Sequence, residues 1–211
     1  MDLLTHEKQL WQLGINCIAG VDEVGRGALA GPLVAGAVIL NACSTQNEAF
    51  KEYAQINDSK LLTPKKREIL SEFIKQTSVC WAVYEIAPAQ IDEWGVAKST
   101  QTVFLGAVEK LAVKPQHILV DAFPIKAVDK KIQTNLKHGD RLSISIAAAS
   151  IIAKVYRDEL MRQYHTVYEN YGFDRHKGYG TRRHFEAIAL YGPCKIHRFS
   201  FSPFRETLGL S

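Results

Sequence analysis

Two apolar runs near the start of the chain, residues 15–21 and 33–40, are joined by a short glycine-rich connection. Both runs are rich in β-branched residues and bounded by glycine, proline or asparagine, which predicts buried strands. Parallel neighbours need a crossover of about a dozen residues or more, and the Gly27–Pro32 junction leaves no room for a crossover helix. The two strands must therefore be antiparallel. Because the later strands alternate with helices, we expect a mixed sheet.

The connection reads GVDEVGRGALAG, residues 20–31, and nearly matches two phosphate-binding patterns. The stretch Gly20–Gly27 has the spacing of a P-loop, but Arg26 and Gly27 stand where lysine and serine or threonine are needed. Both nucleotide-binding patterns also require a helix directly after the glycines, whereas Pro32 begins another strand. The two adjacent carboxylates of the stretch would repel a phosphate. A nucleotide-binding enzyme that uses this loop is therefore an alternative, not the favoured interpretation.

The rest of the chain alternates strand-like apolar runs with helical periodicity. The clearest helix is TPKKREILSEFIKQ, which has Thr63 as a suitable N-cap and proline at its first helical position. Its apolar side chains Ile69, Leu70, Phe73 and Ile74 are expected on one face. The other predicted elements are strands at 79–86 and in HILVDAF, helices at 91–111, 143–168 and 181–190, and loops at 41–46 and 125–138.

A length of 211 residues allows a sizeable core. We expect a single domain over 1–211, with its motifs in 20–184 and a C-terminal helix and tail in 185–211. No segment has the apolar length of a membrane span, and the N-terminus lacks the apolar centre of a signal peptide. The four cysteines are widely spaced and form no C-x-x-C pair, which favours buried free thiols in a reducing cytoplasm.

Charge is distributed unevenly along the chain. Lysine and arginine minus aspartate and glutamate gives −3 for residues 1–121 and +7 for residues 122–211, which together make the net charge of +4. An acidic half that meets a basic half suits an enzyme acting on a polyanion, because carboxylates hold cations while lysine and arginine neutralise phosphates. Ordinary solvated faces produce such a surplus as well, so the charge alone is weak evidence.

Four carboxylates stand at the ends of predicted elements. Asp22 and Glu23 follow a buried strand, Asp121 ends HILVD, and Asp140 precedes the long helix at 143–168. Hard cations such as Mg²⁺ take carboxylate oxygens together with water and substrate phosphate, and a two-metal site needs several acids from different segments. The four acids therefore predict a metal-dependent catalytic site that acts on phosphate.

Each of these acids also has an ordinary structural interpretation. An aspartate at a strand end is most often a turn residue or cap, and Asp140 can simply begin a turn. For Asp22 and Glu23 together the metal site is favoured, although successive strand residues point to opposite faces. Glu23 must then lie past the regular strand, or reach round by its longer side chain or its carbonyl. Asp158 has Lys154 and Arg162 at helical spacing, which predicts a solvated ion-pair face.

These residues resemble the motifs of ribonuclease HII, the type 2 ribonuclease H family. The resemblance runs in the family's order through GVDEVGRGALAGPLVAGAVIL, NDSKLLTPKKRE, HILVDAF, KHGDRLSISIAAASIIAKVYRD and HKGYGTRRH, and HRFSFSP near the end is also similar. Ribonuclease HIII normally has a DNA-binding extension before the first motif and lysine in the middle of the tripeptide. Here 19 residues precede Gly20 and the residue is Arg26, which favours HII.

The resemblance implies an α/β ribonuclease H-like fold, with a central mixed sheet of about five strands, flanking helices and additional C-terminal helices. It implies an endoribonuclease that hydrolyses the RNA strand of RNA–DNA hybrids and cleaves 5′ of ribonucleotides embedded in duplex DNA, leaving 5′-phosphate ends, with Mg²⁺ or Mn²⁺ as cofactor. It also implies a cytoplasmic monomer with no membrane partner, active in ribonucleotide excision repair. The alternatives are a non-catalytic hybrid-binding module and the nucleotide-binding enzyme described above.

Carried over by motif, the family's catalytic and metal-binding acids fall on the same four residues that the ligand argument selects. Its substrate-sensing tripeptide falls on Gly25, Arg26 and Gly27, and its tyrosine that senses the 2′-hydroxyl falls on Tyr179. Glycines allow main-chain groups to approach the minor groove, and the 2′-hydroxyl distinguishes RNA from DNA. The residues expected to contact backbone phosphates or to brace this loop are Lys60, Lys154, Lys177, Arg182 and Arg183 for phosphate, and His176 and His184 for bracing.

Overall fold

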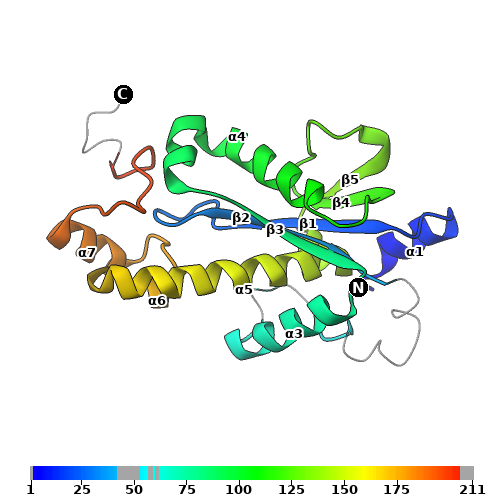
Figure 1. The fold of residues 1–211 in the computed structure, drawn as a ribbon, viewed down its shortest axis with the longest axis horizontal. Helices are drawn as coiled ribbons and strands as arrows, with labels where there is room; N and C mark the ends of the chain where they lie inside the picture. Colours follow the sequence, from blue (N-terminus) through cyan, green and yellow to red (C-terminus); the bar gives the residue numbers. More distant parts are fainter. Residues whose placement is uncertain (1, 42–52, 57–58, 60–61, 205–211) are drawn as a thin grey trace.

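The computed structural model describes residues 2–41, 53–56, 59 and 62–204. A five-stranded sheet in the order β3–β2–β1–β4–β5 runs through the molecule (Figure 1). Antiparallel pairing joins β1 to β2 and β2 to β3, whereas β1, β4 and β5 pair in parallel. The prediction of a mixed sheet with an antiparallel first pair is confirmed. The strands are β1 (Ile18–Val24), β2 (Leu33–Ile39), β3 (Cys80–Ile86), β4 (His117–Asp121) and β5 (Gln133–Leu136).

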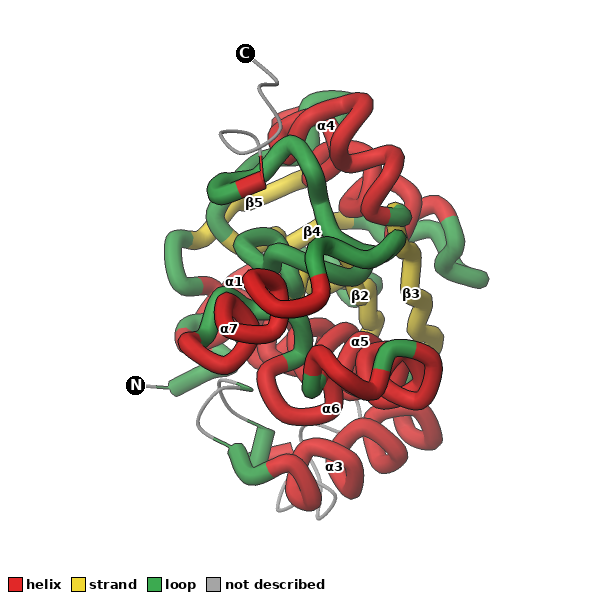
Figure 2. Tube along the Cα trace, turned by 90° about the vertical axis from the view of Figure 1, so that its left-hand side faces the viewer, coloured by secondary structure: helices red, strands yellow, loops and turns green. Residues whose placement is uncertain are grey.

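Helices cover both faces of the sheet. On one face α4 packs against β1, β2 and β3; on the other α5 packs against β1 and β2, and α3 packs on α5. Figure 2 shows the same layering from the side, from α4 through the strands to α5 and then α3. The helices are α1 (Thr5–Gln12), α3 (Pro64–Thr77), α4 (Pro88–Glu109), α5 (Ile144–Val167), α6 (Phe173–His176) and α7 (Arg182–Tyr191), with short 3-10 turns at Lys130–Ile132, Gly139–Arg141 and Glu169–Tyr171.

Three helices begin where the sequence predicts, because a hydroxyl caps each of them. The side chains of Thr63, Ser143 and Thr181 accept hydrogen bonds from main-chain N–H groups three residues later, at 3.2–3.3 Å. The apolar face of α3 is narrower than expected: Leu70 is buried and Ile69 is exposed. The prediction that Ile69 shares the buried face of α3 is therefore wrong, since Leu70 and Ile74 are the residues that pack in the cluster with α5.

Alternation along β1 sends its side chains into two cores. Ala19 and Val21 belong to the cluster between the sheet and α4, while Gly20 faces α5. A Cβ added to Gly20 would lie 2.0 Å from the main-chain carbonyl carbon of Ser145, so the glycine lets α5 lie directly on the strand. This close approach brings the N-terminal half of α5 next to Asp22.

Several features differ from the expectations or lie outside them. Strand β5 falls inside the predicted loop 125–138. Its sequence QTNL is polar, and its buried Gln133 forms hydrogen bonds with the main chain of Ile125 instead of packing by apolar contact, so no apolar run marks it as a strand.

The described cysteines are free but only half-buried, so the prediction of buried thiols is wrong for them. Most of the predicted loop at 41–46 lies outside the described residues. The assignment of 1–211 to one domain stays a prediction.

Candidate active site

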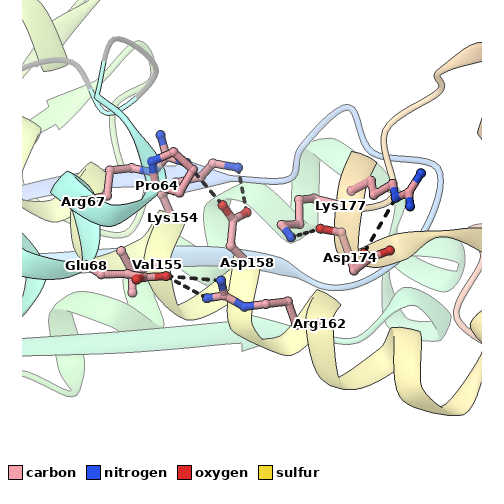
Figure 3. A pocket seen from close by; sticks show the side chains of 10 residues that line it. Pro64, Arg67, Glu68, Lys154, Val155, Asp158, Arg162, Asp174 and Lys177 are labelled. Atoms are coloured by element: carbon pink, nitrogen blue, oxygen red, sulfur yellow. Dashed lines mark hydrogen bonds and ion pairs between the residues drawn. The ribbon is translucent and has the colours of Figure 1, made fainter.

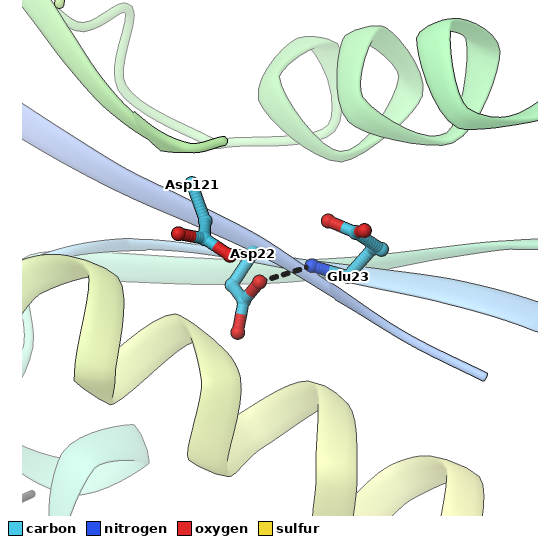
Figure 4. Close-up of side chains that lie close together, drawn as sticks. All are labelled: Asp22, Glu23 and Asp121. Atoms are coloured by element: carbon cyan, nitrogen blue, oxygen red, sulfur yellow. Dashed lines mark hydrogen bonds between the residues drawn. The ribbon is translucent and has the colours of Figure 1, made fainter. Parts of the chain in front are cut away.

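Three carboxylates meet where β1 and β4 run side by side. Asp22, Glu23 and Asp121 each offer an oxygen, and these oxygens all lie within 4.8 Å of one another (Figure 4). The parallel register pairs Val21 with Val120, so the next residue of each strand is an acid. Open α/β sheets place their sites at the carboxyl ends of parallel strands for the same geometric reason.

Glu23 reaches the cluster from within the strand. The structure extends β1 to Val24 and pairs Glu23 with Ala35 of β2, so the expectation that Glu23 lies past the regular strand is wrong. Asp22 points toward α5 and Glu23 toward the opposite side (Figure 4). The longer glutamate side chain nevertheless brings an oxygen to the cluster, as the second of the expected alternatives requires.

The electrostatics of the cluster favour a bound cation. Burial raises the pKa of the Asp22 carboxyl well above its ordinary value, and the charges of Glu23 and Asp121 raise it further. A hydrogen bond with Ser150 of α5 opposes this rise in pKa. The ligand set contains only oxygen, which is the donor that hard divalent cations take. These residues fit a divalent metal ion, whose charge would offset their mutual repulsion.

Asp140 lies beside the cluster without joining its three converging oxygens. It is buried in the 3-10 turn Gly139–Arg141, close enough to raise the pKa of Asp22. The same turn is tied to the cluster directly, because the N–H of Gly139 donates to Asp121 Oδ1 at 2.6 Å. The fourth predicted acid therefore lies next to the site, but its carboxylate is not one of the three whose oxygens converge.

The Gly25–Gly27 tripeptide forms the loop that leaves β1 next to the acids. Gly25 has φ +88°, and a Cβ there would lie 2.1 Å from Nε of Arg157, so both the backbone and the space require glycine. Gly27 is exposed, and a Cβ there would meet no atom within 4 Å. Its main chain is therefore open to an approaching ligand.

Tyr179 belongs to a second loop that is bonded to the first. The carbonyl of Gly178 accepts hydrogen bonds from the N–H groups of Leu29 and Ala30, at 2.8 and 3.2 Å. Tyr179 is partly exposed, and the guanidinium of Arg157 lies 5.5 Å from its ring centroid. The glycine tripeptide and the tyrosine thus form one surface, called here the loop pair, made of residues 25–32 and 177–179.

Two buried arginines hold the loop pair, and the sequence analysis missed both. Arg157 donates to the carbonyls of Pro32, Ala30 and Lys177 at 2.9–3.0 Å. Arg198 donates to the carbonyls of Gly31 and Arg26, at 2.8–3.1 Å. Burial lowers the pKa of both guanidinium groups, that of Arg198 to about 9. A main-chain carbonyl can belong to any residue type, so no sequence pattern marks these partners.

Three histidines support the loop pair by hydrogen bonds, as predicted for His176 and His184; together with His197 they are called here the histidine relay. The carbonyl of Tyr179 can only accept, so His184 donates to it from Nδ1 at 3.0 Å and accepts at Nε2 from Nε2–H of His197, at 3.1 Å. His197 in turn accepts at Nδ1 from the N–H of Cys194, at 2.8 Å. His176 accepts at Nδ1 from the N–H of Gly178, at 3.2 Å. Burial lowers the pKa of all three imidazoles, which favours the neutral forms that these hydrogen bonds require.

Lys154 lines a pocket of about 430 Å³ between α3, α5 and α6 (Figure 3). It pairs with Asp158 at 2.7 Å, and Arg67 approaches the same carboxylate at 3.7 Å. Asp158 is buried, so the expectation of a solvated face is wrong, although its ion pair with Lys154 is confirmed. Arg162 pairs with Glu68 and Glu159 instead. Lys60 lies outside the described residues.

Comparisons with known proteins agree with this geometry. The family model described as Ribonuclease HII matches residues 19–203. The ribonuclease HII of Acholeplasma laidlawii is 48% identical over 208 residues, which cover 99% of this chain and 98% of that protein. The ribonuclease H2 of Pyrococcus horikoshii has a similar structure, with TM-score 0.74 and 28% identity over 90% of this chain and 95% of that one. The Bst-RNase HIII solved with Mn²⁺ gives TM-score 0.67 and 21% identity over 95% and 71% of the chains.

The fold and the acidic site define an enzyme of the ribonuclease H class, and the predicted ribonuclease H-like fold is confirmed. The matches over almost the whole chain go further. The chain belongs to the ribonuclease HII family, whose members are endoribonucleases that act on RNA–DNA hybrids. Among the helices in the described part of the chain, none combines the length and the apolar character needed to cross a bilayer.

Proposed function

We propose that this protein cleaves duplex DNA on the 5′ side of an embedded ribonucleotide, in addition to the RNA strand of hybrids, and leaves 5′-phosphate ends. The observation that carries the proposal is the position of the loop pair directly after the acids of β1. A single ribonucleotide in DNA differs from its neighbours by one 2′-hydroxyl, so its recognition needs fixed groups beside the reacting phosphate.

In this proposal Asp22, Glu23 and Asp121 hold Mg²⁺ or Mn²⁺, and Asp140 beside them binds metal or orients the attacking water. When bound, such ions supply Lewis-acid stabilisation and a nucleophilic water for in-line attack on the phosphate. Ser150 and the N–H of Gly139 orient the carboxylates toward the shared centre. The oxygen-only ligand set supports this assignment, as does a Mn²⁺ complex of Bst-RNase HIII, a protein of similar fold.

The loop pair recognises the ribonucleotide. The open main chain at Gly27 offers an N–H and a carbonyl to the minor groove, and Tyr179 offers a ring for the sugar and a hydroxyl for the 2′-position. Gly25 and Arg26 complete this surface. Lys154 and Lys60 neutralise backbone phosphates, which positions the duplex without reading its sequence.

We further infer a monomer that works in the cytoplasm and removes ribonucleotides from DNA. The substrate class supports the repair role, since ribonucleotides within duplex DNA must be cut before they can be replaced. A protein of similar fold was solved as the PCNA:RNase HII complex from Archaeoglobus fulgidus, with TM-score 0.72.

A duplex with one ribonucleotide tests the proposal. Protein stripped of metal with a chelator should leave this substrate intact, and added Mg²⁺ or Mn²⁺ should restore a single cut 5′ of the ribonucleotide. Asp22→Asn should lower turnover on the order of a thousandfold, because several kcal/mol of charge stabilisation depend on the ligand. Asp129→Asn is the matched control, since Asp129 is exposed and caps Lys131 with an oxygen that asparagine keeps. Binding without metal-dependent cleavage would instead support the hybrid-binding module.

The remaining alternative, a nucleotide-binding loop at Gly20–Gly27, has lost its structural basis. Strand β2 follows this stretch where a phosphate cradle needs a helix N-terminus. Titration with ATP and NAD should therefore give no saturable binding.

A further inference from the structure

Phe123 is an exposed aromatic ring beside the acidic site, and although it ends the motif HILVDAF, the metal site and the proposed recognition of the ribonucleotide give its side chain no role. It lies two residues after Asp121, and the residue is 39% exposed. The guanidinium carbon of Arg26 lies 4.5 Å from the centre of its ring. This contact joins the segment after β4 to the middle residue of the glycine tripeptide.

A strained turn aims the ring. Ala122 has φ +54°, a conformation that alanine rarely adopts, and the N–H of Phe123 donates to the carbonyl of Asp121 at 2.6 Å. The turn is pinned to β5 on both sides of the peptide, by Ala122 N–H to the carbonyl of Leu136 at 2.9 Å and by Asn135 to the carbonyl of Ala122 at 3.3 Å. Strain of this kind persists where the surroundings fix a position that matters.

Arg26 is held at both ends. Arg198 donates to its main-chain carbonyl at 3.1 Å, and Phe123 stacks under its guanidinium. A free arginine this close in sequence to Asp22 and Glu23 would be drawn onto their carboxylates. None of the ion pairs found between described residues includes Arg26. The ring therefore supplies the attraction that holds the guanidinium at the rim.

We propose that Phe123 is a positioning residue: it holds the Arg26 guanidinium at the rim of the site, off the acids and facing the phosphate backbone of the substrate. This inference rests on the proposed role of the loop pair at the ribonucleotide. It requires a π face, because an aliphatic side chain of similar size offers packing without attraction for a cation.

Substitutions at Phe123 distinguish attraction of the Arg26 guanidinium by the aromatic ring from simple packing against it. Phe123→Leu should raise KM for a duplex with one ribonucleotide about three- to fivefold with kcat nearly unchanged, which is the scale of an exposed cation–π contact. Phe123→Tyr and Phe123→Trp should restore the wild-type KM. The melting temperature should stay the same, since the side chain is exposed. Trp81→Leu is the matched control: Trp81 is also 39% exposed, has Lys75 at 5.4 Å from its ring, and lies on the edge strand β3.

A double-mutant cycle tests whether Phe123 acts through Arg26. In an Arg26→Gln background, Phe123→Leu should change KM by less than 1.5-fold, on the order of the additivity error of such cycles. An unchanged KM in Phe123→Leu, a failure of tyrosine to rescue, or a full effect in the Arg26→Gln background would each overturn the proposal. Wild-type protein that leaves the same duplex uncut with metal present would contradict the proposed function instead, so the two failures are distinguishable.

Discussion

The acidic cluster and the loop pair lie side by side, but they are built in different ways. Strand register positions the acids. Strands β1 and β4 pair in parallel, and Asp22 and Asp121 each follow directly after the paired residues Val21 and Val120. Side chains from distant segments position the loop pair, through Arg157, Arg198 and the histidine relay. The first arrangement follows from the sheet, whereas the second depends on side chains from α5 and from the segment that follows α6.

The two regions also bury groups of opposite charge, carboxylates in the acidic cluster and guanidinium groups in the loop pair. Burial and the charges of the neighbouring acids raise the pKa of Asp22, and a bound cation would offset this cost. The loop pair buries two guanidinium groups that bond to main-chain carbonyls instead of carboxylates. A metal ion would therefore complete the first region, while hydrogen bonds already satisfy the buried guanidinium groups of the second. Variants that cut these hydrogen bonds should disturb folding, in contrast to variants of the acids.

Loss of Arg157 should give the largest effect on stability. Arg157→Met leaves the carbonyls of Ala30, Pro32 and Lys177 without their buried donor, at about 1–3 kcal/mol each, partly offset because a buried charge is also removed. We expect a net loss of about 3 kcal/mol in the free energy of unfolding, measured by urea denaturation.

Arg162→Met on the same helix is the matched control. Arg162 is exposed and pairs with Glu68 and Glu159, and exposed ion pairs of this kind contribute less than about 1 kcal/mol. Equal losses in the two variants would contradict the idea that the loop pair depends on buried donors.

The same difference decides what could be predicted from sequence. The acidic cluster could be predicted because carboxylates at strand ends are a pattern of residue type and position, and the start of α3 could be predicted because the hydroxyl of Thr63 marks its cap. Arg157 and the carbonyl of Pro32 are 125 residues apart, and the carbonyl has no signature in the sequence. Strand β5 was not predicted for a related reason. Its buried Gln133 forms hydrogen bonds with the main chain of Ile125 and Val128, and these partners come together only in the folded chain.

Acid should weaken the loop pair through its histidines. Burial lowers the pKa of His184 and of His197 to about 4, below the ordinary value near 6.5. The unfolded chain therefore binds protons first as pH falls, so the stabilisation is complete above about pH 6.5 and is lost as pH falls toward 4. Protonation would also set two N–H groups against each other between the rings. We expect a loss on the order of 2–3 kcal/mol for each of these two histidines in the free energy of unfolding between pH 7 and pH 4.5.

Comparison of two histidine variants isolates this effect from the titration of carboxylates. His184→Gln should be less stable at pH 7 and show a flatter pH dependence of unfolding than the wild type. His6→Gln is the control, because His6 lies on α1 outside the relay. Parallel pH profiles for His184→Gln and the wild type would show that the relay carries no linked protons.

Tyr179 tests whether the loop pair senses the ribonucleotide or only completes the fold. Its carbonyl belongs to the histidine relay, but its ring is partly exposed and can be truncated without touching that hydrogen bond. Tyr179→Ala should lower kcat/KM about tenfold on a duplex with a single ribonucleotide, the scale of one lost stacking or hydrogen-bond contact. It should lower kcat/KM less on a continuous hybrid, where neighbouring ribonucleotides offer other registers for cleavage. Tyr179→Phe separates the two contacts, because it keeps the ring and removes the hydroxyl. Equal losses of kcat/KM on both substrates would mean that the tyrosine supports cleavage in general. The loop pair would then serve the acidic cluster and would not recognise the single ribonucleotide.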